Sequence, residues 1–497
     1  MTLDLIIRGG TVADGTGAPG FVADVGIVGD RIHAIGDLAA AEVRDSIDAT
    51  GLIVAPGFVD VHNHASNEMD GGILNIPTVE NQIRQGVTTL ISGNCGGSPW
   101  PLGEHLDAAA TLPIRQNYGL LVGMGTLRGQ VNIGSQEASP EQVAAMQDLA
   151  RRAMDEGAFG MSTGYFPDFV TTEEIAAVAR PIAEGGGVYA THMRSEGPRL
   201  LESIAETIRI CEESGCPAQI SHIKTWGVSA WGKIDRSLEL IDEAAARGLD
   251  ITADRYPYVA AFSGIANTVP TALRIEAANR GGLEHLYDED LADAVRDGVN
   301  AYVAELGGPE HIVFAPLDPM PEIDGKSLAE VAAERGEEPW QSAVALTIQG
   351  RVSCMWFAMR EENIATFMRH PRVFAASDGH LRVLGKGVSH PRNYGTFPRW
   401  IGHYGRDMGL FTVEEVVRKC SAMPASKLGL HNRGTLAPQK IADITIFDWE
   451  TIIDTATFEA PHSYPKGIPH VIVAGKPGLR DGAVAEASYG RVLRLAQ

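Results

Sequence analysis

Eight short apolar runs, separated by stretches with helical periodicity, constrain the fold of this chain more than any other feature. Alternating strands and helices of this kind form a parallel sheet, and eight such units close into a barrel. Between the runs, for example over 140–157 and 237–248, apolar residues recur about every 3.6 positions. The sequence therefore predicts an α/β fold, a (β/α)8 barrel of the TIM type. The runs are FVDVHNH (58–64), TTLISGNC (88–95), YGLLVGM (118–124), AFGMST (158–163), VYATHM (188–193), AQISHI (218–223), DITADRYP (250–257) and VFAASDG (373–379).

Both ends of the chain differ from the middle. Residues 1–56 and 434–497 contain short strand-like segments separated by glycine-rich turns, which is typical of antiparallel β structure. We expect the two ends to pair into one small β-sandwich, with the barrel over residues 57–433. Within the barrel, an insertion of about 259–372 is longer than one helix requires, so it must carry extra elements. HIVFAPL (311–317) is a candidate strand there.

Charge and hydropathy exclude several classes of partner. A net charge of -22 argues against nucleic-acid binding, which relies on clustered Lys and Arg. Asp4 and Arg8 interrupt the apolar opening, so it is not a signal peptide, and no run approaches the roughly 18 apolar residues of a membrane span. We expect a cytoplasmic protein with no membrane partner, and the sequence leaves its oligomeric state open. The 5 cysteines are too scattered for a disulfide framework.

Six side chains suited to metal binding fall at the ends of predicted strands. Each one alone has a plainer explanation, because a lone histidine or cysteine in a strand is often a core residue. In a barrel, however, the C-terminal strand ends converge on one face, where catalytic groups lie. The coincidence of all six favours a metal site. They are His62 and His64 in the first run, Cys95 in the second, His192 in the fifth, His222 in the sixth and Asp378 in the eighth.

Longer motifs resemble a known enzyme family. LDLIIRGGTVADGTG (3–17), GLIVAPGFVDVHNH (51–64) and GTLAPQKIADITIFD (434–448) resemble the amidohydrolase superfamily, whose members join a metal-binding barrel to a β-sandwich made from both chain ends. SGNCG (92–96), YATHMRSE (189–196), ISHIK (220–224) and HPRNYGTFPR (390–399) resemble more closely the N-acyl-D-amino-acid deacylases, or D-aminoacylases. The resemblance runs nearly from end to end.

This resemblance implies a specific metal centre. Cys95 stands in the place of a cysteine that, in this family, replaces the metal-bridging carboxylated lysine of hydantoinases and dihydroorotases. It implies one tightly bound Zn²⁺ on Cys95, His192 and His222. His62, His64 and Asp378 would frame a second, weaker site. A thiolate with two imidazoles suits zinc, and an open fourth position suits catalysis.

The resemblance also implies the reaction, which is hydrolysis of a small-molecule N-acyl-D-amino acid to a carboxylate and a free D-amino acid. Asp378 would act as general base and then as general acid. The resemblance places Lys224 and Tyr256 on the substrate α-carboxylate, with Arg392 as a further candidate. Arg194 and Glu196 are weaker candidates for substrate binding, and Trp226 and Trp231 are candidate walls of an apolar pocket. The chain departs from the family pattern at Arg255 and Phe262.

Two other functions stay open. A cyclic-amide hydrolase of the hydantoinase or dihydroorotase kind, or a modified-dipeptide hydrolase, would use similar metal chemistry. The cyclic-amide enzymes predict a carboxylated lysine at the end of the fourth run, where this chain has Ser162, Thr163 and Gly164. A non-catalytic barrel used for binding or assembly would be expected to have lost ligands, and all six are present.

Overall fold

The computed structural model describes residues 2–67, 72–315, 320–350 and 352–495, and its central element is a ring of parallel strands. Two parallel sheets form the ring, with the orders β6-β7-β8 and β17-β13-β12-β11-β10-β9. Only Leu121 separates β8 from β9, and a parallel bridge between Asn63 and Gly379 joins the ends of β6 and β17. The strands are β6 (Phe58–Asp60), β7 (Val87–Ser92), β8 (Asn117–Leu120), β9 (Val122–Gly123), β10 (Gly160–Thr163), β11 (Val188–Thr191), β12 (Ala218–Ile220), β13 (Ile251–Arg255) and β17 (Val373–Ala375).

Each of the eight predicted runs overlaps one of these strands, and the third run is divided between β8 and β9. The predicted (β/α)8 barrel is therefore confirmed. Helices lie between most successive strands, as the periodicity indicates, and a 3-10 turn (Ile83–Gln85) precedes β7. The helices that accompany the barrel are α1 (Leu102–Ala110), α2 (Met124–Gln130), α3 (Pro140–Asp155), α4 (Thr172–Glu184), α5 (Leu200–Ser214), α6 (Ile234–Ala246), α11 (Glu361–Arg369), α12 (Arg392–Arg399), α13 (Val413–Cys420) and α14 (Ala422–Lys427).

Helix α3 shows how the local sequence fixes these elements. Ser139 caps it in a capping box with Gln142, and Pro140 occupies its first turn, where a missing N–H costs nothing. Its buried face includes Met146 and Ala150, which are one turn apart. No helix among the described residues is long and apolar enough to cross a membrane.

The two ends of the chain pair with each other, as predicted, and they form one nine-stranded sheet with the order β21-β20-β19-β18-β5-β1-β2-β3 and with β4 beside β1. The expectation of purely antiparallel strands is wrong, because β1 pairs in parallel with both β4 and β5. The chain crosses back after the β2–β3 hairpin, which brings β4 and β5 alongside β1 in the same direction. Strand β18 from the C-terminal part pairs with β5. The strands are β1 (Leu5–Val12), β2 (Phe21–Val28), β3 (Arg31–Gly36), β4 (Ser46–Asp48), β5 (Ile53–Pro56), β18 (Ile444–Phe447), β19 (His470–Val473), β20 (Lys476–Arg480) and β21 (Ala483–Val484).

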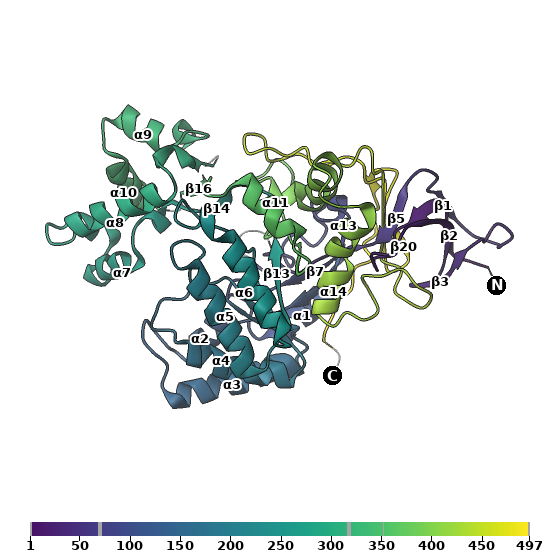
Figure 1. Ribbon diagram of the computed structural model, residues 1–497, viewed down its shortest axis with the longest axis horizontal. Coiled ribbons are helices and arrows are strands. Elements are labelled where there is room, and N and C mark those ends of the chain that lie inside the picture. The colour runs from purple at the N-terminus through teal and green to yellow at the C-terminus, as the bar shows by residue number, and fades with distance from the viewer. Residues whose placement is uncertain (1, 68–71, 316–319, 351, 496–497) are drawn as a thin grey trace.

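The interval between β13 and β17 carries extra elements, which project from the barrel on the side away from the terminal sheet (Figure 1). They have a small sheet with the order β14-β16-β15 and an apolar cluster of their own, which includes Val299, Leu346 and Trp356. The candidate strand at 311–317 contains β15, while its residues 316 and 317 lie outside the described ranges. The elements are β14 (Ala261–Gly264), α7 (Thr271–Arg280), α8 (Ala292–Glu305), β15 (Ile312–Phe314), α9 (Leu328–Arg335), α10 (Pro339–Gln349) and β16 (Ser353–Trp356).

Candidate metal centre

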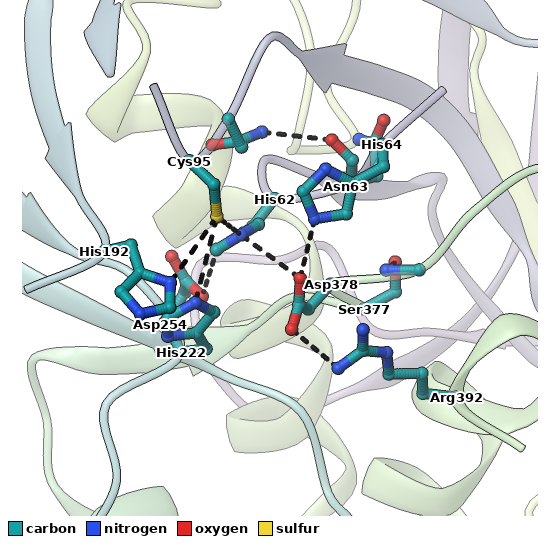
Figure 2. A network of polar contacts seen from close by, with 12 residues as sticks. His62, Asn63, His64, Cys95, His192, His222, Asp254, Ser377, Asp378 and Arg392 are labelled. Atoms are coloured by element: carbon teal, nitrogen blue, oxygen red, sulfur yellow. Dashed lines mark hydrogen bonds and ion pairs between the residues drawn. The ribbon is translucent and has the colours of Figure 1, made fainter. Parts of the chain in front are cut away.

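The six candidate ligands meet where the barrel strands end (Figure 2). They follow β6, β7, β11, β12 and β17, so segments far apart in the chain supply them. Their donor atoms form two groups, and within each group the atoms lie within 4.8 Å of one another. Cys95 belongs to both groups, because its thiol lies between the two sets of imidazoles. The first group is His62, His64, Cys95 and Asp378, and the second is Cys95, His192 and His222.

Three of these residues have a left-handed backbone, which is unfavourable for any residue with a side chain. The φ angles are 54° at Cys95, 36° at His222 and 49° at Asp378. Hydrogen bonds hold two of them in place: the amide of Asp378 donates to the carbonyl of His62 at 2.7 Å, and the amide of His222 donates to Asp254 Oδ1 at 2.7 Å. Strain of this kind is typical of functional sites.

The Cys95 loop is supported by the end of β10, where a cyclic-amide hydrolase would have its carboxylated lysine. The Ser162 hydroxyl accepts a hydrogen bond from the amide of Gly96 at 3.0 Å and donates one to the carbonyl of Gly93 at 2.6 Å. A Cβ added at Gly96 would lie 2.6 Å from the amide nitrogen of Gly164, so the two backbone segments can lie this close only with glycine at position 96. Residues at the end of the fourth run therefore position Cys95.

The surroundings of Cys95 favour a thiolate. Its Sγ lies 3.5 Å from His62 Nε2, 3.9 Å from His192 Nδ1 and 3.9 Å from His222 Nε2. Burial alone would raise the pKa of the thiol, but the positive charge of His62 and the hydrogen bonds from the three imidazoles outweigh it and hold the pKa well below its usual value. A thiolate among imidazoles is a donor set that suits zinc.

Asp378 is held between histidines and an arginine. Its Oδ1 lies 2.9 Å from His64 Nε2 and 3.4 Å from His62 Nε2, and its Oδ2 accepts a hydrogen bond from Arg392 Nη1 at 2.7 Å. Burial alone would raise the pKa of this carboxyl, but the charge of Arg392 and the hydrogen bond from His64 outweigh it and keep the pKa well below the usual value. Asp378 is therefore ionised at neutral pH.

Asp254, at the end of β13, is a site residue that the sequence analysis missed. Its Oδ1 lies 3.1 Å from His62 Nδ1, on the far side of the ring from Cys95, and its Oδ2 accepts a hydrogen bond from Gln219. Burial alone would lower the pKa of His62, but the charges of Asp254 and Cys95 outweigh it and raise the pKa well above its usual value. The available signal was position, because Asp254 lies in the seventh run, next to the last residue of β13, and the candidate ligands also follow strand ends.

Glu196 and Lys224 form a second cluster beside His222. Lys224 Nζ lies 2.5 Å from Glu196 Oε1 and 2.7 Å from His222 Nδ1, and the same Glu196 oxygen is 2.9 Å from His222 Nδ1. Burial alone would raise the pKa of Glu196, but the charge of Lys224 and of the nearby histidines lowers it strongly. Glu196, a weak candidate from the sequence, therefore contacts both a candidate metal ligand and a candidate substrate-binding residue.

Tyr256 is buried beside this cluster, and its hydroxyl has no hydrogen-bond partner within the described parts of the chain. Its ring centroid lies 6.5 Å from that of His222, 5.1 Å from Arg392 Cζ and 5.9 Å from Lys224 Nζ. The three residues predicted to hold the substrate carboxylate therefore lie together. An orphaned buried hydroxyl is unfavourable, and it suggests a site built for a ligand group.

The remaining candidates lie elsewhere. Arg194 donates to Glu206 and to three backbone carbonyls. Trp226 packs near Trp356, with ring centroids 6.4 Å apart, and the indole of Trp231 donates to the carbonyl of Ala358. Two residues depart from the family pattern. Arg255 is fully buried, and its guanidinium donates a hydrogen bond to the carbonyl of Tyr258. The ring centroid of Phe262 lies 6.4 Å from that of His390.

Comparisons with known proteins place these features in context. A family model described as "Amidohydrolase family" matches residues 45–477. The chain is 37% identical to the D-aminoacylase of Alcaligenes xylosoxydans xylosoxydans, covering 99% of this chain and 97% of that protein. A D-aminoacylase structure that addresses the role of a binuclear metal centre, with one-metal activation and second-metal attenuation, is 35% identical with a TM-score of 0.83 over 99% of this chain and 100% of the other. The N-acyl-D-glutamate deacylase of Bordetella bronchiseptica, solved with zinc and a phosphonate that mimics the tetrahedral intermediate, is 29% identical with a TM-score of 0.84 and the same coverage.

Proposed function

Because this chain belongs to the amidohydrolase family, and within it to the N-acyl-D-amino-acid deacylases, we propose that it hydrolyses the amide bond of N-acyl-D-amino acids to a carboxylate and a free D-amino acid. The observation that carries the proposal is the position of Cys95, whose thiol joins two groups of imidazoles beside an ionised Asp378. Membership also supports the proposed division into a catalytic barrel (57–433), its insertion (259–372) and a β-sandwich (1–56 with 434–497).

The donor atoms fit a zinc centre. A thiolate with a lowered pKa and the two imidazoles of His192 and His222 would hold one Zn²⁺ tightly and leave a fourth position open. His62, His64 and Asp378 would share Cys95 to form a second, weaker site. The zinc in the glutamate deacylase and the binuclear centre studied in the D-aminoacylase support this proposal. When bound, zinc acidifies water and polarises a carbonyl.

Asp378 has the properties of the proton carrier. Its carboxylate is ionised, so it can accept a proton from the attacking water, and it belongs to the ligand group that shares Cys95 with the tight site. The hydrogen bond from Arg392 fixes its Oδ2, while Oδ1 faces the histidines. The same carboxyl would then deliver the proton to the departing amine, which must leave in neutral form.

Tyr256, Lys224 and Arg392 would bind the α-carboxylate. Tyr256 offers an unused hydroxyl, and Arg392 offers an Nε without a partner among the described residues. Lys224 is fixed by Glu196 and carries the charge that attracts an anion. The Tyr256 hydroxyl and the charges of Lys224 and Arg392 beside its ring suit a carboxylate held at a fixed distance from the metal.

The test is release of free amino acid from N-acetyl and longer N-acyl amino acids, D and L in parallel, with protein of measured zinc content. We expect hydrolysis of D substrates only. Zinc-replete protein that cleaves hydantoins or modified dipeptides, and leaves the whole acyl panel intact, would replace the proposed substrate class while retaining amide hydrolysis. Asp378→Asn serves as the inactive control for every substrate.

A further inference from the structure

His222 faces two partners that it cannot satisfy together. Its Nδ1 lies 2.9 Å from Glu196 Oε1 and 2.7 Å from Lys224 Nζ. A carboxylate only accepts hydrogen bonds and an ammonium only donates them. Nδ1 must therefore carry a proton to bond with Glu196, and it must lack that proton to accept from Lys224. The Lys224 side chain is only 3% exposed and that of Glu196 only 11%, so water can do little to relieve the competition.

This competition for Nδ1 decides whether the other ring nitrogen of His222, Nε2, can bind a metal. His222 Nε2 is the nitrogen that faces Cys95, at 3.9 Å from Sγ. A neutral imidazole carries one proton, so Nε2 offers a lone pair to a metal only when the proton is on Nδ1. The bond to Glu196 selects that tautomer, whereas the bond from Lys224 selects the tautomer that cannot bind metal at Nε2.

His62 provides an internal comparison. Its Nδ1 faces Asp254 Oδ1 at 3.1 Å, and that carboxylate also accepts hydrogen bonds from Gln219 and from the backbone amide of His222. No ammonium competes for the Nδ1 of His62 among the described contacts. Nδ1 of His62 therefore faces a single carboxylate, whereas Nδ1 of His222 faces both a carboxylate and an ammonium.

We infer that Glu196 is a positioning residue, which directs His222 Nε2 to the metal by outcompeting Lys224 for Nδ1. Carboxylates that accept the free N–H of a metal-binding histidine typically raise metal affinity 10- to 100-fold. In the metal-binding tautomer Lys224 keeps Glu196 as its partner and has further N–H groups for a ligand anion. That last consequence rests on the proposed function, since it identifies the anion as the substrate carboxylate.

The test is zinc affinity, measured on metal-free protein by competition with a fluorescent chelator. Glu196→Gln leaves Lys224 with His222 Nδ1 as its stronger acceptor, so we expect zinc to bind about 10- to 100-fold more weakly. Lys224→Met removes the competitor, so zinc should bind as tightly as in the wild type or more tightly. The double variant should recover most of the affinity lost in Glu196→Gln, because the wrong tautomer then has no donor to stabilise it.

A matched control is Glu206→Gln, which makes the same chemical change at a carboxylate bonded to Arg194. It should leave zinc affinity unchanged. Thermal unfolding of each metal-free variant separates a loss of fold from a loss of tautomer control. The inference is overturned if folded Glu196→Gln binds zinc within twofold of the wild type, or if Lys224→Met weakens zinc as much as Glu196→Gln does. None of these measurements uses a substrate, so an inert acyl panel would refute the proposed substrate and leave this inference intact.

Discussion

Replacing Asp378 by Asn isolates the proposed proton carrier, because the two side chains have nearly the same shape. Asn keeps one acceptor oxygen for Arg392 or His64, but it cannot take a proton from water. Cys95, His192 and His222 are untouched, so the tight zinc should remain. The second site should weaken, since it loses its only carboxylate.

The expected loss follows from the role assigned to the residue. A positioned general base contributes about 10²- to 10⁴-fold, so kcat should fall by that factor, which is about 3 to 5 kcal/mol in the activation barrier. Arg392 is 4% exposed and would lose its charged partner, so some stability is lost as well.

The assay combines amino-acid release, zinc content and thermal unfolding on the same preparation. Asp443→Asn is the control for breaking a buried ion pair, because Asp443 is 4% exposed, binds Arg433 and directly precedes β18 of the terminal sheet. It should lower the unfolding temperature and leave kcat almost unchanged. Folded Asp378→Asn protein that retains one zinc and turns over within tenfold of the wild type would refute the assignment.

Three further predictions concern other residues. Cys95→Ser should yield folded protein with little zinc by elemental analysis and no activity, since a neutral hydroxyl is a poor zinc ligand. Cys211→Ser is the control, because burial raises the pKa of the Cys211 thiol, and it should retain both zinc and activity. Tyr256→Phe should raise KM about tenfold and leave the unfolding temperature equal or higher, because the removed hydroxyl has no partner among the described residues; an unchanged KM would contradict its role. Burial lowers the pKa of His105 to about 4, below the usual 6.5. As the pH falls, His105 takes up a proton at a higher pH in the unfolded chain than in the folded one. The free energy of unfolding is therefore at its full value above pH 6.5 and decreases by up to about 3 kcal/mol between pH 6.5 and 4. In His105→Gln this decrease should be absent from the unfolding curves, and a variant with the pH dependence of the wild type would contradict the prediction.

Local sequence determined the elements that carry the site. Strand runs and helical periods are properties of neighbouring residues, so the eight strands could be predicted, along with helix α3 and its cap. Ligand positions followed from the same pattern, because strand ends in a barrel share one face whatever lies between them. The pairing of both chain ends was also predictable, although the direction of β4 and β5 was not.

Tertiary structure decided which side chains serve the ligands. Asp254 and His62 are 192 residues apart, and no short motif records that one orients the other. Glu196 was only a weak candidate because its role depends on sharing His222 Nδ1 with Lys224, a conflict that exists only once the strands have closed. Sequence period fixes which face a side chain takes, but hydrogen bonds act over about 3 Å, and only the folded barrel sets distances on that scale.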